Sequence, residues 1–288
     1  MPESLKEWYE QLMGTFGLKG LQIPVTAIKI YPKGKSLPDP VKEYHLDDLT
    51  LTGCQACRQA SYGDAVCLTL KNIGCIAAAI SFGLVSSQSP EPLGGPRVYT
   101  DLMRAQASVP DSFSPPSPKD FSEGIVYACQ AAGRMDFNLF GPEDSGRYQD
   151  LTTARRAIAA MSSISPATTQ AVFFYPVDFE EDSIRPDLLV LNVRPVELTR
   201  LIQACQYQTG QPSSASMGAL RVVCSDLIAR PFLTKKINIS TYCLGARLIG
   251  KYEAERLGIG IPYELLDPIL DGMKKSKTGY PFHLYPGA

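Results

Sequence analysis

The spacing of hydrophobic residues along the chain predicts alternating helices and strands. After Ser4, which suits a helix N-cap, the residues Leu5, Trp8 and Leu12 recur at helical intervals, so a helix is expected over 4–16. Short β-branched and aliphatic runs predict strands at 25–31, 65–70, 124–130, 171–175, 188–193 and 237–240. Helical periodicity and capping residues predict further helices at about 54–63, 75–82, 97–108, 151–164, 195–205 and 263–273.

One stretch of this pattern occurs twice. The segments 55–79 and 203–227 both begin with Gln-Ala-Cys, pass a glycine, and reach a second cysteine, Cys75 or Cys224, that opens a small-residue or leucine-rich helix. A predicted strand that ends in proline precedes each segment. We interpret the two segments as one strand–helix–strand–helix unit used twice.

The order of elements indicates an α/β or α+β protein, because strands and helices alternate along the chain. We expect residues 1–288 to form a single compact domain with an N-terminal helix. Its two pseudo-repeated halves would span approximately 21–110 and 170–275, and the Ser/Pro-rich segment 111–118 is the best candidate for a linker.

Composition narrows the class of protein. A formal net charge of −1 argues against a dedicated nucleic-acid-binding protein. The longest apolar run, 73–84, is too short to cross a bilayer, and the N-terminus has no signal-peptide pattern. These features predict a cytoplasmic protein without membrane insertion, in which the eight cysteines are thiols, metal ligands or redox groups rather than structural disulfides.

Familiar catalytic and nucleotide-binding motifs are missing, and the chain has only two histidines, His45 and His283. The chemistry that remains belongs to the cysteines. Cys54 and Cys57 have the spacing of a redox dithiol, but they lie within a predicted helix rather than at its start, which disfavours a thioredoxin-like role. We name no catalytic residue, and whether the protein is an enzyme stays open.

If the halves pack about a pseudo-twofold axis, Cys57 and Cys75 would face Cys205 and Cys224, with Cys243 close by. Four thiolates from scattered positions can hold an iron–sulfur cluster or a zinc ion. The alternative is that a buried cysteine is a small hydrophobic side chain. That alternative suits Cys205 on an apolar helix face and Cys129 in a predicted strand.

A further motif runs from Cys243 to Arg247, Cys-Leu-Gly-Ala-Arg. Gly245 allows close backbone approach, and the fork of donors on Arg247 suits a carboxylate or phosphate. The competing interpretation is that Arg247 pairs with Glu253 or Glu255 on the surface.

The ordered set of motifs resembles a known family. The motifs are Gln-Ala-Cys followed by Asn-Ile-Gly-Cys, Pro186-Asp187 before the strand at 188–193, Pro195, the segment that begins at Cys224, and Cys-Leu-Gly-Ala-Arg-Leu followed by Leu-Gly-Ile-Gly-Ile-Pro. Together they resemble the bacterial and archaeal domain of unknown function family 169 over most of residues 20–275. The resemblance implies functional positions at Cys57, Cys75, Cys224, Cys243, Gly245 and Arg247, but no activity.

The leading hypothesis is a cytosolic protein that binds an iron–sulfur cluster, [4Fe–4S], on Cys57, Cys75, Cys224 and Cys243, where Cys57 is the weakest ligand because Cys54 could replace it from one turn away. It would serve in electron transfer or anaerobic cofactor metabolism. The alternative is a metal-free protein that binds an anionic small molecule or tetrapyrrole on Gly245 and Arg247, and a thiol redox enzyme is the third reading. The expected partners are a small molecule or a redox partner protein, with a homo-oligomer possible.

Overall fold

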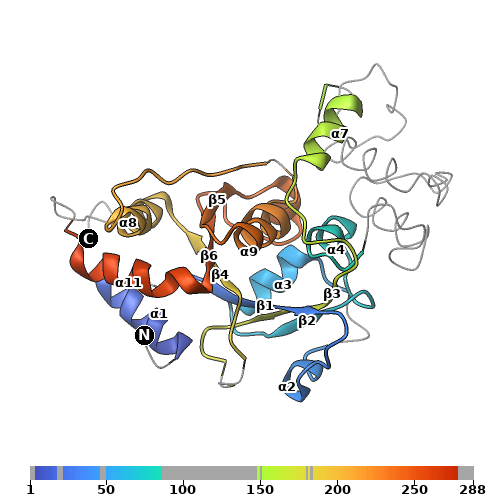
Figure 1. Ribbon diagram of the computed structural model, residues 1–288, viewed down its shortest axis with the longest axis horizontal. Helices are drawn as coiled ribbons and strands as arrows, with labels where there is room; N and C mark the ends of the chain where they lie inside the picture. The colour runs from blue at the N-terminus through green and yellow to red at the C-terminus, as the bar shows by residue number, and fades with distance from the viewer. Residues whose placement is uncertain are drawn as a thin grey trace.

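A six-stranded, fully antiparallel sheet forms the centre of the computed structural model (Figure 1), with strand order β2-β3-β1-β4-β6-β5. The structure describes residues 4–17, 22–45, 50–85, 148–149, 151–179, 181, 184–218 and 220–277. The strands are β1 (Val25–Pro32), β2 (Val66–Leu68), β3 (Thr169–Tyr175), β4 (Leu188–Val193), β5 (Asn238–Thr241) and β6 (Leu257–Pro262). The expected strand at 124–130, the helix at 97–108 and the linker at 111–118 lie outside the described residues.

The helices alternate with these strands along the chain. They are α1 (Leu5–Thr15), α2 (Asp39–Lys42), α3 (Gly53–Ala60), α4 (Ile76–Ser81), α7 (Leu151–Ala159), α8 (Pro195–Gln206), the π-helix η3 (Val222–Ala229), α9 (Arg230–Thr234), α10 (Leu244–Leu248), the 3-10 helix η4 (Tyr263–Leu265) and α11 (Leu266–Lys275). The mixed α/β class, the N-terminal helix and the single compact body agree with the sequence analysis.

Helices cover both faces of the sheet, which explains why its central strands are hydrophobic along their whole length. In β4, Leu188 and Val190 face one side, while Leu189 and Leu191 face the other. The first side, here called the α3 face, is covered by α3, α4, η3, α9 and α10. The second side, the α8 face, is covered by α1, α8 and α11, which lie together in Figure 1.

The two halves of the sheet have the same topology. Along the chain, β1 takes a central position, β2 the edge, and β3 the position between them; β4, β5 and β6 repeat this order on the other side. In chain order, α2, α3 and α4 of the first half correspond to α8, η3 and α10 of the second. This symmetry divides the sheet into β1–β3 and β4–β6, whereas the predicted halves, 21–110 and 170–275, put β3 in the second; a duplication of the chain stays a prediction.

The predicted pairing between the two copies is wrong. The helix that carries Cys57 lies on the α3 face, whereas the helix that carries Cys205 lies on the α8 face. No strand is present between α8 and η3 in the described residues, and β3 completes the first half rather than starting the second. The second Gln-Ala-Cys lies on α8, whereas η3 is the helix of the second half that shares the face of the sheet with α3.

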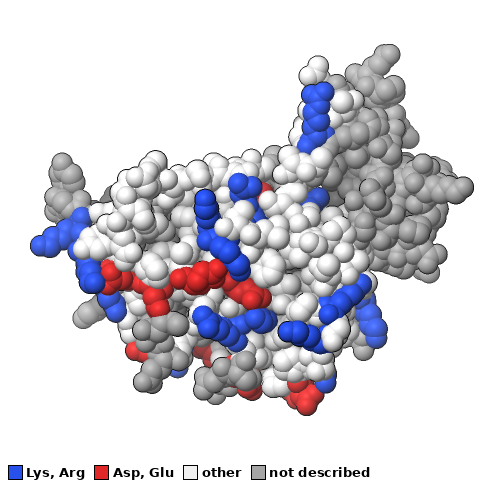
Figure 2. All heavy atoms as spheres, viewed as in Figure 1, with Lys and Arg blue, Asp and Glu red and all other residues white. Residues whose placement is uncertain are grey.

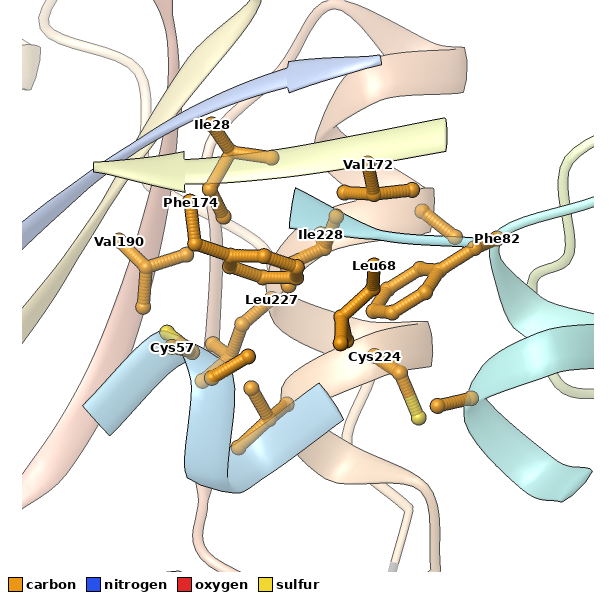
Figure 3. Packing of buried hydrophobic residues seen from close by; sticks show 14 of the residues in the cluster. Ile28, Cys57, Leu68, Phe82, Val172, Phe174, Val190, Cys224, Leu227 and Ile228 are labelled. Carbon is orange, nitrogen blue, oxygen red and sulfur yellow. The ribbon is translucent and has the colours of Figure 1, made fainter. Parts of the chain in front are cut away.

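Close packing fixes the position of η3 on the sheet. A Cβ atom added to Gly260 of β6 would lie 2.1 Å from the carbonyl oxygen of Leu227, and one added to Gly258 would lie 2.1 Å from the Leu227 side chain. The two glycines of Leu-Gly-Ile-Gly-Ile-Pro thus let the π-helix contact the backbone of β6 directly. Leu227 consequently lies deep in the core of the α3 face (Figure 3).

Candidate functional site

Four cysteines lie at the starts of four helices on the α3 face. Cys75 and Cys243 are the N-cap residues of α4 and α10, Cys54 is the second residue of α3, and Cys224 is the third residue of η3. Two of them belong to each half of the duplicated sheet, in the corresponding helices. Cys224 is buried, while the other three are partly exposed. We call these four residues the four-thiol site.

The thiols lie within electrostatic reach of one another. Burial, together with the neighbouring Cys75 and Cys243, raises the pKa of Cys54 to about 12, although a hydrogen bond with Thr52 opposes the rise. Burial also raises the pKa of Cys224, and Cys75 and Cys243 again act in the same direction. Without a bound cation the thiols of Cys54 and Cys224 are therefore protonated at neutral pH, and a metal would bind with release of their protons.

The described residues contain no group of three or more His, Cys, Asp or Glu side chains arranged to hold one metal ion. The pKa of Cys54 and that of Cys224 nonetheless respond to Cys75 and Cys243, so these thiols are neighbours.

Cys57 lies apart from the four-thiol site. It is 2% exposed and belongs to the hydrophobic cluster under α3. Figure 3 shows it on the side of α3 that faces Val190 and Phe174 of the sheet. Burial raises the pKa of Cys57, opposed by hydrogen bonds from Tyr252 and Thr26. Cys57 was the predicted ligand, with Cys54 as its alternative, and in the structure Cys54 is the one that neighbours Cys75 and Cys243.

The first turn of α3 is held in place by its neighbours. Thr52 and Gln55 form a capping box, and the Thr52 hydroxyl lies 3.1 Å from the Cys54 sulfur. The Tyr252 hydroxyl donates to the Cys54 carbonyl over 3.3 Å, and its ring stacks on Tyr242 with centroids 4.1 Å apart. These contacts fix the backbone from which the Cys54 thiol extends.

An ion pair joins the same helix to the loop before β6. The guanidinium of Arg58 donates to both carboxylate oxygens of Glu253, over 2.7 and 2.8 Å, and Asn192 donates to Glu253 as well. Burial alone would raise the pKa of Glu253, but these hydrogen bonds outweigh it and lower the pKa to about 2. The pair connects the first half of the chain to the second beside the four-thiol site.

Arg247 is engaged within the protein. It donates to the backbone carbonyl of Glu253, and its guanidinium lies 5.8 Å from the centre of the Tyr242 ring. A Cβ added to Gly245 would make only ordinary contact, at 4.0 Å from the Cys243 sulfur, so close approach does not require glycine there. An anion-binding role for Gly245 and Arg247 therefore stays a prediction.

The remaining candidates are distributed elsewhere. His45 lies 2.8 Å from the Thr69 hydroxyl, and Cys67 and Cys205 contribute to the core of the α8 face. Cys129 and His283 lie outside the described residues. The choice between Cys54 and Cys57 was left open by the sequence, and neither the support from Tyr252 nor the position of Arg221 at the N-cap of η3 was predicted. The sequence does hold a signal for Cys54. Matching Cys54 and Cys75 with Cys224 and Cys243, instead of matching the two Gln-Ala-Cys runs, would have favoured Cys54.

Neither the charges on the surface nor the lengths of the helices indicate a further binding site. Basic and acidic residues are interspersed on the face drawn in Figure 2, so neither sign dominates it. In the part of the chain that the structure describes, no helix has both the length and the apolar character needed to cross a membrane.

Comparison with known proteins places the chain in a family. No match was found among curated proteins or among solved structures. The family model of domain of unknown function family 169, described as uncharacterised ArCR, matches residues 18–272 and so covers both halves of the sheet and all four thiols. This chain is therefore a member of domain of unknown function family 169.

Proposed function

We propose that this protein binds an iron–sulfur cluster, [4Fe–4S], on Cys54, Cys75, Cys224 and Cys243. The observation that carries the proposal is the meeting of four cysteines at the starts of four helices, two from each half. Cysteine thiolates are the usual ligands of such clusters. Cys54 replaces Cys57 in the ligand set because Cys57 packs against the sheet.

The local environment suits thiolate ligands. The first turn of a helix has backbone amides without intrahelical acceptors, and its dipole favours negative charge. The amides of Ala78 and Ala77 lower the pKa of Cys75 in this way, although burial has the larger effect and raises it. When bound, a cluster supplies one-electron chemistry, and we infer a role in electron transfer or in anaerobic cofactor metabolism.

A thiol–disulfide enzyme has less support. Reactive cysteines have a lowered pKa and some exposure, whereas burial raises the pKa of both Cys54 and Cys57. The tetrapyrrole alternative is also weaker, because the guanidinium of Arg247 already donates to the Glu253 carbonyl and lies against Tyr242.

The test is anaerobic purification or reconstitution with iron and sulfide. We expect about four irons per chain and a broad absorbance band at about 400 nm, as is typical of a [4Fe–4S] cluster. Single replacements of Cys54, Cys75, Cys224 or Cys243 by alanine should each abolish or strongly reduce the bound iron. Cys57→Ala and Cys205→Ala are matched controls that should retain it. A wild-type protein without iron and sulfide after reconstitution, or dependence on Cys57 rather than Cys54, would contradict this assignment.

A further inference from the structure

Arg221 is a buried arginine with an unusual environment. It precedes η3 as its N-cap and is 6% exposed. Its backbone is left-handed, with φ 57° and ψ 29°, a conformation that costs a residue other than glycine about 1 kcal/mol or more. Strain of this kind persists where the surrounding structure holds the residue in place.

The guanidinium of Arg221 connects two of the helices that carry the thiols. Its Nε donates to the Ser81 hydroxyl of α4 over 3.1 Å, and one terminal nitrogen donates to the Ser163 hydroxyl over 2.7 Å. The Cys224 thiol donates to the Arg221 carbonyl over 3.4 Å. Arg221 therefore connects the start of η3, which carries Cys224, to the last residue of α4, the helix whose N-cap is Cys75.

Among the described residues, no carboxylate forms an ion pair with Arg221. Its hydrogen-bond partners among the described residues are the two neutral serine hydroxyls. Asp226 senses the charge, but its carboxylate accepts from the Ser240 hydroxyl and the Gly218 amide. A buried charge without a counter-charge is costly, so an anionic neighbour is expected.

A second buried arginine shows the contrast. Arg200, on the α8 face, is also 6% exposed, but it donates to the backbone carbonyls of Met273 and Ser276 at the end of α11. The negative end of that helix compensates its charge. Arg221 instead contacts the hydroxyl of Ser81, the last residue of α4, and its charge opposes the effect of burial on the pKa of Cys75 and of Cys224.

We propose that Arg221 is the counter-charge of the four-thiol site, which stabilises the anionic cluster there and raises its reduction potential. This inference rests on the proposed function. On reduction the cluster takes one electron from a donor such as dithionite and gains one negative charge, and no bond in the protein breaks. A nearby fixed positive charge favours that more negative state.

The experiment measures iron content and midpoint potential in anaerobic dithionite titrations followed by absorbance and electron paramagnetic resonance. Arg221→Gln keeps a donor for Ser81 but removes the charge. We expect the one-electron equilibrium to shift toward the oxidised cluster by tenfold or more, which corresponds to about 59 mV. Arg221→Lys should stay close to the wild-type potential, and Arg200→Gln, on the opposite face, should leave it unchanged.

A second pair of variants tests the charge without removing the arginine. Ser163→Asp places a carboxylate where Arg221 already donates, and Ser163→Asn is its neutral counterpart. The aspartate variant should have a lower potential than the asparagine variant. This pair decides the question if Arg221→Gln does not fold.

The outcomes separate the two proposals. If the wild-type protein binds no cluster, the four-thiol assignment fails and this inference fails with it. If the wild-type protein binds a cluster, and Arg221→Gln and Ser163→Asp both retain it at the wild-type potential, only the role of Arg221 is overturned. Loss of the cluster from folded Arg221→Gln, with retention in Arg221→Lys, supports the inference.

Discussion

At the scale of single residues, the contact between Arg58 and Glu253 connects the two halves beside the thiols. Only 28% of the Glu253 side chain is exposed, and its carboxylate accepts from Arg58, Asn192 and Tyr62. Because both arginine donors and the amide stabilise the ionised form, folding favours the charged carboxylate.

This lowered pKa predicts a pH dependence of stability. Glu253 titrates near 4.5 when unperturbed and at about 2 in the folded chain, so its contribution is complete above pH 4.5 and is lost as the pH falls toward 2. Glu253→Gln should reduce the free energy of unfolding at pH 7 by about 1 kcal/mol, allowing for solvent screening. Urea denaturation at pH 7 and pH 3 measures this, and the difference should shrink at pH 3.

Glu264→Gln is the matched control, since Glu264 pairs with Lys235 at 3.7 Å with both side chains well exposed. Its replacement should change stability little at either pH. An equal effect of the two substitutions, or an effect of Glu253→Gln that grows in acid, would rule out the role given to Glu253.

At the scale of elements, the contact of η3 with β6 determines where Cys224 lies. The carbonyl of Leu227 occupies the space above Gly260, so any side chain at that position displaces the π-helix. The strain at Arg221 and the π-helical winding both lie in this short segment. Such irregular turns occur frequently at functional sites.

Gly260→Ala should therefore destabilise the protein by about 3 kcal/mol, at the upper end of the usual cost of overpacking. Gly14→Ala is the control, because a Cβ on that residue of α1 meets nothing within 4 Å. Alanine in a helix interior should stabilise the chain by about 0.5 to 1 kcal/mol. Thermal and urea unfolding of both variants measure the effects, and full tolerance of Gly260→Ala would show that η3 can move away from the sheet.

Periodicity was sufficient to predict the helices and strands that bury a regular face. The helix after Ser4, the helix opened by Pro195 and the strand at 188–193 all form where the sequence indicates them. Hydrophobic periodicity could not predict the π-helix η3, because its winding depends on the contact with Gly258 and Gly260 of β6 rather than on the helix preference of its own residues.

The parts of the candidate site that depend on local sequence could be predicted, and the parts that depend on tertiary packing could not. Cys75 and Cys243 could be assigned to helix starts from local sequence, and both are N-caps. Cys54 and Cys57 are one turn apart, so only the direction in which α3 packs on the sheet decides which thiol meets the others. The position of the Arg221 guanidinium could not be predicted either, because its partners Ser81 and Ser163 are distant in the chain.

At the scale of the whole molecule, the proposed cluster would join both halves and bind only the folded chain. Its binding free energy would therefore add to folding stability. The reconstituted protein should unfold at a higher urea concentration than chelator-treated protein, with a gain of about 3 kcal/mol if the cluster is present at roughly 100 times its dissociation constant. Circular dichroism under anaerobic conditions measures both transitions.

The Cys75→Ala variant supplies the control for that comparison. It lacks one of the four thiols, so treatment with iron and sulfide should leave its unfolding transition where it was. Identical transitions for the treated and untreated wild-type protein would mean that the four thiols do not link the halves through a bound group.

The division of the thiols between two equivalent halves has a consequence for how the chain arose. A chain with one half would carry two of the four cysteines and would complete the site only by pairing with a second copy of itself. Fusion of two such copies makes that symmetric pair permanent and frees each half to change separately. The first helices of the two halves, α2 and α8, differ in this way, with 4 residues in one and 12 in the other, while each half still carries two of the thiols on the α3 face.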